Sequence, residues 1–232
     1  MPINCYNQPI GEPINNWQPC DLPDTGPLQG NYCRIEKLNP TQHSRALYKA
    51  LCENSAESNW TYLPYGPFEG ETQFNDWLST QVQSTDPLFY TIIDLESDCA
   101  IGMASYLRIE PAIGVIEVGH IHFSHALQRT PHATEAMYLM MKRVFDTGYR
   151  RYEWKCDALN APSKRAAERL GFSYEGCFKQ ATMYKGRNRD TAWYAITDEA
   201  WQPQSQAFER WLAADNFDAQ GKQRTSLAAL KD

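Results

Sequence analysis

Residues 114–148 read GVIEVGHIHFSHALQRTPHATEAMYLMMKRVFDTG, and this stretch joins an expected strand directly to an expected helix. Its first part, 114–124, is rich in apolar and β-branched residues, which is typical of a strand. In its second part, apolar residues recur every three or four positions, as they do along one face of a helix. Gly148 is expected to end that helix, because glycine readily adopts the left-handed conformation of a helix terminus. The apolar face comprises Ala133, Ala136, Met137, Met140, Met141, Val144 and Phe145.

The turn between this strand and this helix, LQRTPHATEA at 127–136, is a candidate anion site. The first N–H groups of a helix lack partners within it and lie at the positive end of its dipole, so they attract phosphate. Thr130 is suited to cap the helix, and Pro131 to its first position. An ordinary capped helix has the same pattern, so the turn alone leaves both interpretations open. The donors that remain are the N–H groups of Arg129, Thr130, His132, Ala133 and Thr134, beside the Arg129 guanidinium.

The rest of the chain predicts one α/β domain over 31–214, in which helices pack on a mixed β-sheet. A Pro-, Asn- and Gln-rich arm, 1–30, is expected to lie extended on its surface, and a polar tail, 215–232, follows it. Strands are expected over 31–38, 88–97, 99–110, 114–124, 149–156, 172–186 (a strand pair or a bent strand) and 190–197, and helices over 40–54, 71–83, 161–171 and 198–214.

Composition narrows the classes of function. The net charge of −6 argues against nucleic acid as a partner, because neutralising phosphates requires a basic face, and it suits a cationic amine. The seven cysteines form no C-x-x-C pair, which is typical of reduced thiols in the cytoplasm. The first residues include neither a basic leader nor an apolar run, and no stretch reaches the length of a membrane span. We therefore expect a cytoplasmic protein with no membrane partner.

A second motif lies downstream, in DALNAPSKRAAERLGFSYEG at 157–176. It places Asn160 at the end of a strand, Ser163 at the start of a helix, and a Leu-Gly-Phe at the end of that helix. Asn160 is also suited to be the N-cap of that helix. With EVGH at 117–120 and the turn at 128–134, this order resembles the GNAT superfamily of acyl-CoA-dependent N-acyltransferases, in its ribosomal-protein acetyltransferase-like (RimJ/RimL) branch. The resemblance covers about residues 30–197. It departs from the family at Pro131, where a glycine is usual.

The resemblance implies a GNAT-like fold, a central mixed sheet flanked by helices, and transfer of an acetyl or other short acyl group from acyl-CoA to a primary amine. It also implies a bulge in the strand at 114–124, beside which the pantetheine arm pairs with the backbone. No metal is implied. The residues expected to bind coenzyme A are Ile121, His122, Phe123, Gln128, Arg129, Thr130, His132, Ala133, Thr134 and Asn160.

Three residues are candidates for the chemistry. Glu117 or His120 is suited to accept the proton of the attacking amine, and the resemblance places Ser163 where a hydroxyl protonates the leaving thiolate. Successive side chains along a strand point to opposite faces of the sheet, so Glu117 and His120 are expected on opposite faces unless a bulge intervenes. For each residue a structural role is the alternative: an ion pair for Glu117, lining of the pocket for His120, and a first helical turn for Ser163.

His120 and His122 also share the two-residue spacing of a zinc-binding pair. The third ligand would have to be His125 or His132, and both lie beyond the expected end of the strand. No other metal motif accompanies them. We therefore expect no metal site.

An aromatic loop at 59–70 is the expected acceptor end of the pocket, with Trp60, Tyr62 and Tyr65 as substrate-binding residues. Packing at the edge of the core is the alternative for these rings. A small amine and a protein N-terminus both suit such a loop, and an oligomer is possible. A different class of function, an acyl-CoA sensor with little catalysis, is consistent with the same motifs.

Overall fold

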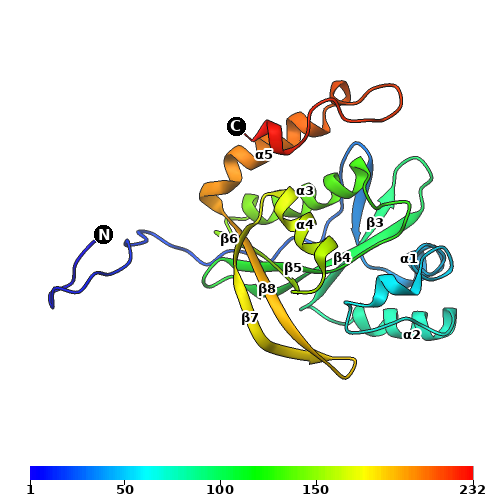
Figure 1. Ribbon diagram of the computed structural model, residues 1–232, viewed down its shortest axis with the longest axis horizontal. Helices are drawn as coiled ribbons and strands as arrows, with labels where there is room; N and C mark the ends of the chain where they lie inside the picture. Colours follow the sequence, from blue (N-terminus) through cyan, green and yellow to red (C-terminus); the bar gives the residue numbers. More distant parts are fainter. Residues whose placement is uncertain (232) are drawn as a thin grey trace.

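The computed structural model describes residues 1–231, and its centre is one mixed sheet of eight strands (Figure 1). The strand order is β1-β2-β3-β4-β5-β6-β8-β7, and β5 pairs with β6 in parallel while the other neighbours are antiparallel. The expected mixed α/β sheet is confirmed. The strands are β1 (Leu28–Gln29), β2 (Cys33–Lys37), β3 (Leu88–Asp94), β4 (Ala100–Glu110), β5 (Val115–Phe123), β6 (Arg151–Asp157), β7 (Ser173–Tyr184) and β8 (Arg187–Thr197).

Helices cover both faces of this sheet (Figure 1). On one face, α3 (Pro131–Asp146), α4 (Ala161–Leu170) and α5 (Asp198–Leu212) bury the larger apolar core. On the other face, α1 (Pro40–Tyr48) and α2 (Glu71–Gln81) bury a smaller core over β3 and β4. Among the described residues, no helix packs on the second face of β5, β6 and β8. Short helical turns are η1 (Lys49–Glu53), η2 (Glu57–Trp60), η3 (Ala214–Asn216) and η4 (Ala228–Leu230).

Helix α3 forms where the sequence predicted it. Thr130 is its N-cap and Pro131 its first residue, and Gly148 has the positive φ of +88° that follows many helices. The apolar face packs on the sheet, with Met140 and Met141 fully buried. The periodic pattern and the two termini therefore account for this helix without reference to the rest of the chain.

The central feature of the sheet is the separation of β5 from β6. Their parallel pairing runs only from Val115–Val118 on β5 to Arg151–Trp154 on β6. Immediately beyond it, β5 has a bulge against β4, and His120 within the bulge has a φ of +51°. Bulges bend and twist a strand. The backbone of residues 119–123 is therefore paired with β4 on one side only.

The polypeptide after α4 forms a long hairpin, and both terminal segments contact the domain. The expected strand at 172–186 is the single bent strand β7, whose pairing with β8 shifts register twice. In the N-terminal arm, the Trp17 indole donates to the Ala112 carbonyl at 2.8 Å, while the residues before it extend away (Figure 1). The C-terminal segment folds back after α5 and buries Leu227 in the main core. Within residues 1–231, no helix is long and apolar enough to cross a membrane.

Candidate active site

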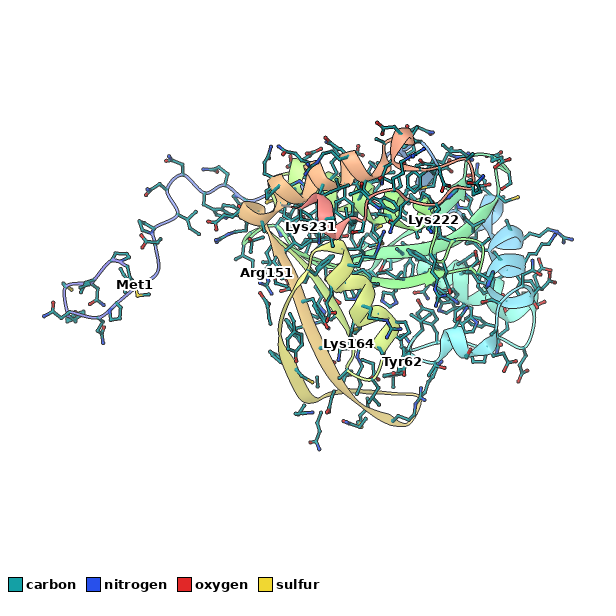
Figure 2. All side chains as sticks on the ribbon, turned by 45° about the horizontal axis from the view of Figure 1, so that its top comes forward. Met1, Tyr62, Arg151, Lys164, Lys222 and Lys231 are labelled. Atoms are coloured by element: carbon teal, nitrogen blue, oxygen red, sulfur yellow. The ribbon has the colours of Figure 1, made fainter. Side chains whose placement is uncertain are left out.

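A cleft of about 1470 Å³ opens where β5 and β6 separate. Its walls come from the N-terminal ends of α3 and α4, the aromatic loop, the β7–β8 hairpin and the C-terminal segment. Tyr62 of the aromatic loop lies beside the start of α4, which Lys164 marks in Figure 2, and its hydroxyl donates to the Leu159 carbonyl at 3.1 Å. The cleft therefore has one end at α3 and another at the aromatic loop.

At the α3 end, the turn before the helix is held by its own side chains. The Thr130 hydroxyl donates to the Leu127 carbonyl at 2.7 Å and accepts from the Ala133 N–H at 3.4 Å. The Gln128 amide donates to the Phe123 carbonyl at 2.8 Å, which ties the turn to the end of β5. Arg129, with a φ of +62°, lines the cleft. The Ala133 N–H is thus partly used by the cap, and Arg129 remains available to an anion.

The His132 side chain does not line the cleft. It lies against Tyr32 and within 3.0 Å of the Asp94 carboxylate, because its position in the first turn of α3 faces β2 and β3. Only its backbone N–H remains as a candidate donor. Thr134 does line the cleft, but its hydroxyl accepts from Arg169 at 3.0 Å.

Arg169 is a cleft residue that the sequence reasoning missed. It projects from α4 toward α3, and its guanidinium stacks over Trp211 at 5.0 Å. No carboxylate forms an ion pair with it among the described residues. Burial lowers its pKa, as expected for a cation without a counter-ion. The sequence does contain one indication of this position. Arg165 and Arg169 are four residues apart, so they lie on the same face of the helix, and Arg165 also lines the cleft.

At the centre of the cleft, Ile121, His122 and Phe123 all line the wall. His122 is 3% exposed, and its ring meets the Trp60 ring edge-on at 3.9 Å. Neither of its nitrogens has a hydrogen-bond partner within residues 1–231. Burial lowers its pKa to about 3, so the imidazole is neutral.

Glu117 is buried beside two cations. Its Oε2 atom lies 2.8 Å from Lys155 Nζ and 3.0 Å from Arg108 Nε. Lys155 is itself buried, 2.7 Å from Glu153 and 3.9 Å from the centre of the Trp193 ring. Burial raises the pKa of Glu117, and the two cations partly oppose that rise. The sequence reasoning did not identify Lys155, which pairs with Glu117 only because β6 lies beside β5.

His120 occupies the bulge of β5, and its ring reaches the cleft. Its Nδ1 atom lies 3.1 Å from the Tyr65 hydroxyl, and its ring stacks on the Tyr65 ring. Burial, assisted by the charge of Arg189, lowers its pKa to about 4. The bulge removes the simple alternation of faces, so both His120 and Glu117 line one cleft.

At the start of α4, Asn160 is the N-cap and accepts from the Ser163 N–H at 3.2 Å. The Ser163 hydroxyl accepts from the Trp154 indole at 3.0 Å, and this hydrogen bond does not use the proton of the hydroxyl. Both residues line the cleft. The capping role of Asn160 is therefore observed, and it does not exclude a contact with a ligand.

The three aromatic residues of the loop lie in different places. Tyr62 lines the cleft, whereas Trp60 is 1% exposed and belongs to the smaller core, because its ring packs between Phe68 and His122. Tyr65 packs on Trp77 and contacts the cleft through His120. In the described part of the chain, no group of three His, Cys, Asp or Glu side chains is placed to hold a metal ion.

β5, β6, α3 and α4 all lie within a part of the chain whose sequence matches a known domain. A sequence model of the acetyltransferase (GNAT) domain matches residues 34–173, more than half of the chain. The chain belongs to the GNAT family of acetyltransferases. The resemblance seen in its motifs is thereby confirmed, and so is its identification as an N-acetyltransferase.

Individual GNAT proteins are similar over most of this chain. A GCN5-related N-acetyltransferase from Brucella melitensis is 44% identical with a TM-score of 0.92, covering 94% of this chain and 100% of that one. A probable acetyltransferase from Chromobacterium violaceum is 39% identical with a TM-score of 0.78, covering 84% and 97%. The ribosomal-protein-serine acetyltransferase of Escherichia coli is 26% identical over 159 residues, covering 66% of this chain and 86% of that protein.

Proposed function

We propose that this GNAT enzyme transfers an acetyl group from acetyl-CoA to a primary amine by direct attack on the thioester. The observation that carries the proposal is the separation of β5 from β6, which leaves the backbone of 119–123 unpaired on its β6 side. Unpaired strand backbone is a template for hydrogen bonding to an extended ligand. The family match supports acetyl transfer as the activity, and the cleft has room for both substrates.

The α3 end of the cleft suits the phosphates of coenzyme A. The N-terminal N–H groups of α3 and the guanidinium groups of Arg129 and Arg169 lie there, and the acidic lining residues Glu117 and Asp157 belong to β5 and β6. Arg169 has no carboxylate partner among the described residues, so its guanidinium is available to form an ion pair with a phosphate. Pro131 removes one N–H from the helix start, and these two side chains compensate for it.

The chemistry needs one base and one acid from the chain. Acetyl-CoA supplies a thioester carbonyl that an amine attacks directly, with a thiolate as the leaving group. Glu117 or His120 accepts the proton that the amine loses, and Ser163 donates a proton to the thiolate sulfur. Backbone N–H groups near His122 polarise the carbonyl oxygen. Each proton thus has a named donor and acceptor.

The test is to compare Glu117→Gln with His120→Asn. If Glu117 is the base, the first variant loses on the order of 100-fold in kcat and its pH–rate profile flattens, while the second retains most of its activity. The measurement is release of free thiol over a panel of amines, with acetyl-CoA affinity and urea unfolding as controls. An unchanged rate in Glu117→Gln would remove Glu117 from the mechanism.

The same measurements address a sensor of acyl-CoA as the alternative. The observation that favours a sensor is the pairing of Glu117 with two cations, which weakens it as a base. Tight binding of acetyl-CoA with no thiol release from any amine would support the sensor.

A further inference from the structure

Two hydrogen-bond donors on the hairpin side of the cleft have no partner in the described part of the protein. They are Nε of Arg189 and Nε1 of Trp193, and both atoms are buried from solvent. His122, across the cleft, adds a buried ring in which neither nitrogen has a partner. Buried polar groups in folded proteins are normally hydrogen-bonded, because burying a donor or an acceptor without a partner costs free energy. Three residues with such groups along one cleft indicate a ligand with hydrogen-bond acceptors.

The strand register places these donors on the face that bears Glu117. Glu117 on β5 lies opposite Glu153 on β6, and Lys155 lies opposite Trp193 on β8 with its ammonium over the Trp193 ring. Since side chains alternate along a strand, Arg189 lies on the same face as Trp193. No helix packs on this face of β6 and β8, and it forms a wall of the cleft.

Arg189 also forms no ion pair with a carboxylate in the part of the chain that the structure describes. Glu117 is held by Lys155 and Arg108. Asp157 accepts from the Tyr184 hydroxyl at 2.7 Å and from the Leu159 N–H at 2.8 Å. Asp190 accepts from Lys179 at 3.0 Å, and it accepts from the Gln180 N–H and the Asn188 amide as well.

The charge of Arg189 is therefore uncompensated, and it affects the electrostatics of the cleft. Arg189 is half-buried, and it contributes to lowering the pKa of His120. A guanidinium in this state binds an oxyanion through two parallel hydrogen bonds. It also repels a second cation.

We propose that the amine accepted by this enzyme also carries an oxyanion, which binds to Arg189, and that the Trp193 N–H is a further donor to the acceptor on the same wall. The proposal rests on the proposed acetyl transfer and names the class of acceptor: an amine with a carboxylate or phosphate close to it, rather than a polyamine. Phe178, stacked on Trp193 at 4.5 Å, adds an apolar wall for the rest of the acceptor.

The turnover experiment uses pairs of acceptors in which one member carries an oxyanion and the other does not. Thiol release is measured with phenylalanine and phenylalaninamide, with phosphoethanolamine and ethanolamine, and with the tripeptide amides Ala-Asp-Ala and Ala-Asn-Ala. These three arms separate a free amino acid, a phosphorylated amine and an acidic peptide N-terminus as sources of the oxyanion. In the wild type, kcat/KM is expected to favour the anionic member of at least one pair by about tenfold or more, and Arg189→Gln to abolish that preference.

The control for charge is Arg150→Gln, because Arg150 packs over Trp17 outside the cleft. This variant should retain the preference and the rate. The inference is overturned if no pair favours its anionic member, or if the preference survives in Arg189→Gln.

A binding experiment keeps this inference separate from the proposed function. The protein saturated with coenzyme A is titrated calorimetrically with N-acetylphenylalanine and N-acetylphenylalaninamide, and likewise with the N-acetylated members of the other two pairs. Tighter binding of an anionic member that is lost in Arg189→Gln supports the oxyanion site even if no amine is turned over. Equal binding within all three pairs, or a difference that persists in the variant, overturns the site while leaving acetyl transfer untouched.

Discussion

His122 makes the stability of the fold depend on pH. Burial lowers its pKa from 6.5 to about 3, so the unfolded chain takes up a proton there at a higher pH than the native protein. Stability from this residue is therefore complete above pH 6.5 and declines as the pH falls toward 3. Between pH 7 and pH 5 one such histidine reduces the free energy of unfolding by about 2 kcal/mol.

We predict that His122→Phe lessens this loss. Urea unfolding at pH 7 and pH 5 should show a fall in stability that is smaller than that of the wild type by about 2 kcal/mol. His120, whose pKa falls to about 4, adds a loss of the same sign that the variant keeps. His125→Asn, at an exposed position in the turn before α3, serves as the control and should behave like the wild type. Equal falls in His122→Phe and the wild type would contradict the prediction.

Glu117 illustrates how far single residues could be interpreted from the sequence. Its place on a strand beside the motif predicted a carboxylate in the site, and it does line the cleft. Its two cations could not be predicted, because Arg108 and Lys155 come from the neighbouring strands β4 and β6. Its role as a base stays a prediction.

The β7–β8 hairpin contacts the aromatic loop at the end of the cleft where we propose that the acceptor binds. Lys185 Nζ donates to the Trp60 carbonyl at 2.7 Å, and Arg187 donates to the Thr61 carbonyl at 2.7 Å (the hairpin reaches below α2 in Figure 1). Both donors lie at the tip of the hairpin, so they connect the hairpin to the aromatic loop across that end of the cleft. Hydrogen bonds from charged groups at such exposed positions are modest, but here two of them act together.

We predict that the double variant Lys185→Ala with Arg187→Ala raises KM for the acceptor by roughly three- to tenfold. The affinity for acetyl-CoA should not change, since neither side chain lines the cleft. Steady-state kinetics gives the KM, and hydrogen exchange of the aromatic loop should accelerate. An unchanged KM together with unchanged exchange would show that these bonds do not hold the acceptor site.

The cleft is rich in cations, although the molecule is acidic as a whole. The chain has a net charge of −6, yet Arg129, Arg165, Arg169 and Lys222 line the part of the cleft near α3 and the C-terminal segment. Lys222 comes from that segment, which lies beyond the matched family domain (Figure 2). The Trp211 indole donates to the Gln223 side chain at 2.8 Å, and this hydrogen bond holds the segment that contains Lys222 against α5.

We predict that Lys222 contributes to binding the nucleotide phosphates. Lys222→Gln should weaken binding of acetyl-CoA by roughly three- to tenfold and should weaken binding of 3′-dephospho-acetyl-CoA less, if the contact is with the 3′-phosphate. Calorimetry at two salt concentrations measures both affinities. Lys37→Gln, at an exposed position outside the cleft, is the matched control. Equal affinities for the variant and the wild type with both ligands would contradict the prediction.

The sequence by itself determined the local elements of this protein. The apolar period of α3, the Thr130 cap and the Asn160 cap of α4 were all predicted, because capping and helical periodicity act between residues three or four positions apart. The order of motifs along the chain also indicated the GNAT family, since those motifs are local too.

Only the tertiary structure decided which of these elements share a site. The separation of β5 from β6 and the bulge at His120 depend on how neighbouring strands pair. Arg169 meets Thr134 across 35 residues of sequence, and Arg189 reaches the cleft on a strand beyond the motifs. The same packing turned His132 toward Asp94 and buried Trp60 in the core. Such contacts join distant parts of the chain, and their partners are set by the register of the sheet and the packing of the core, which no local pattern encodes.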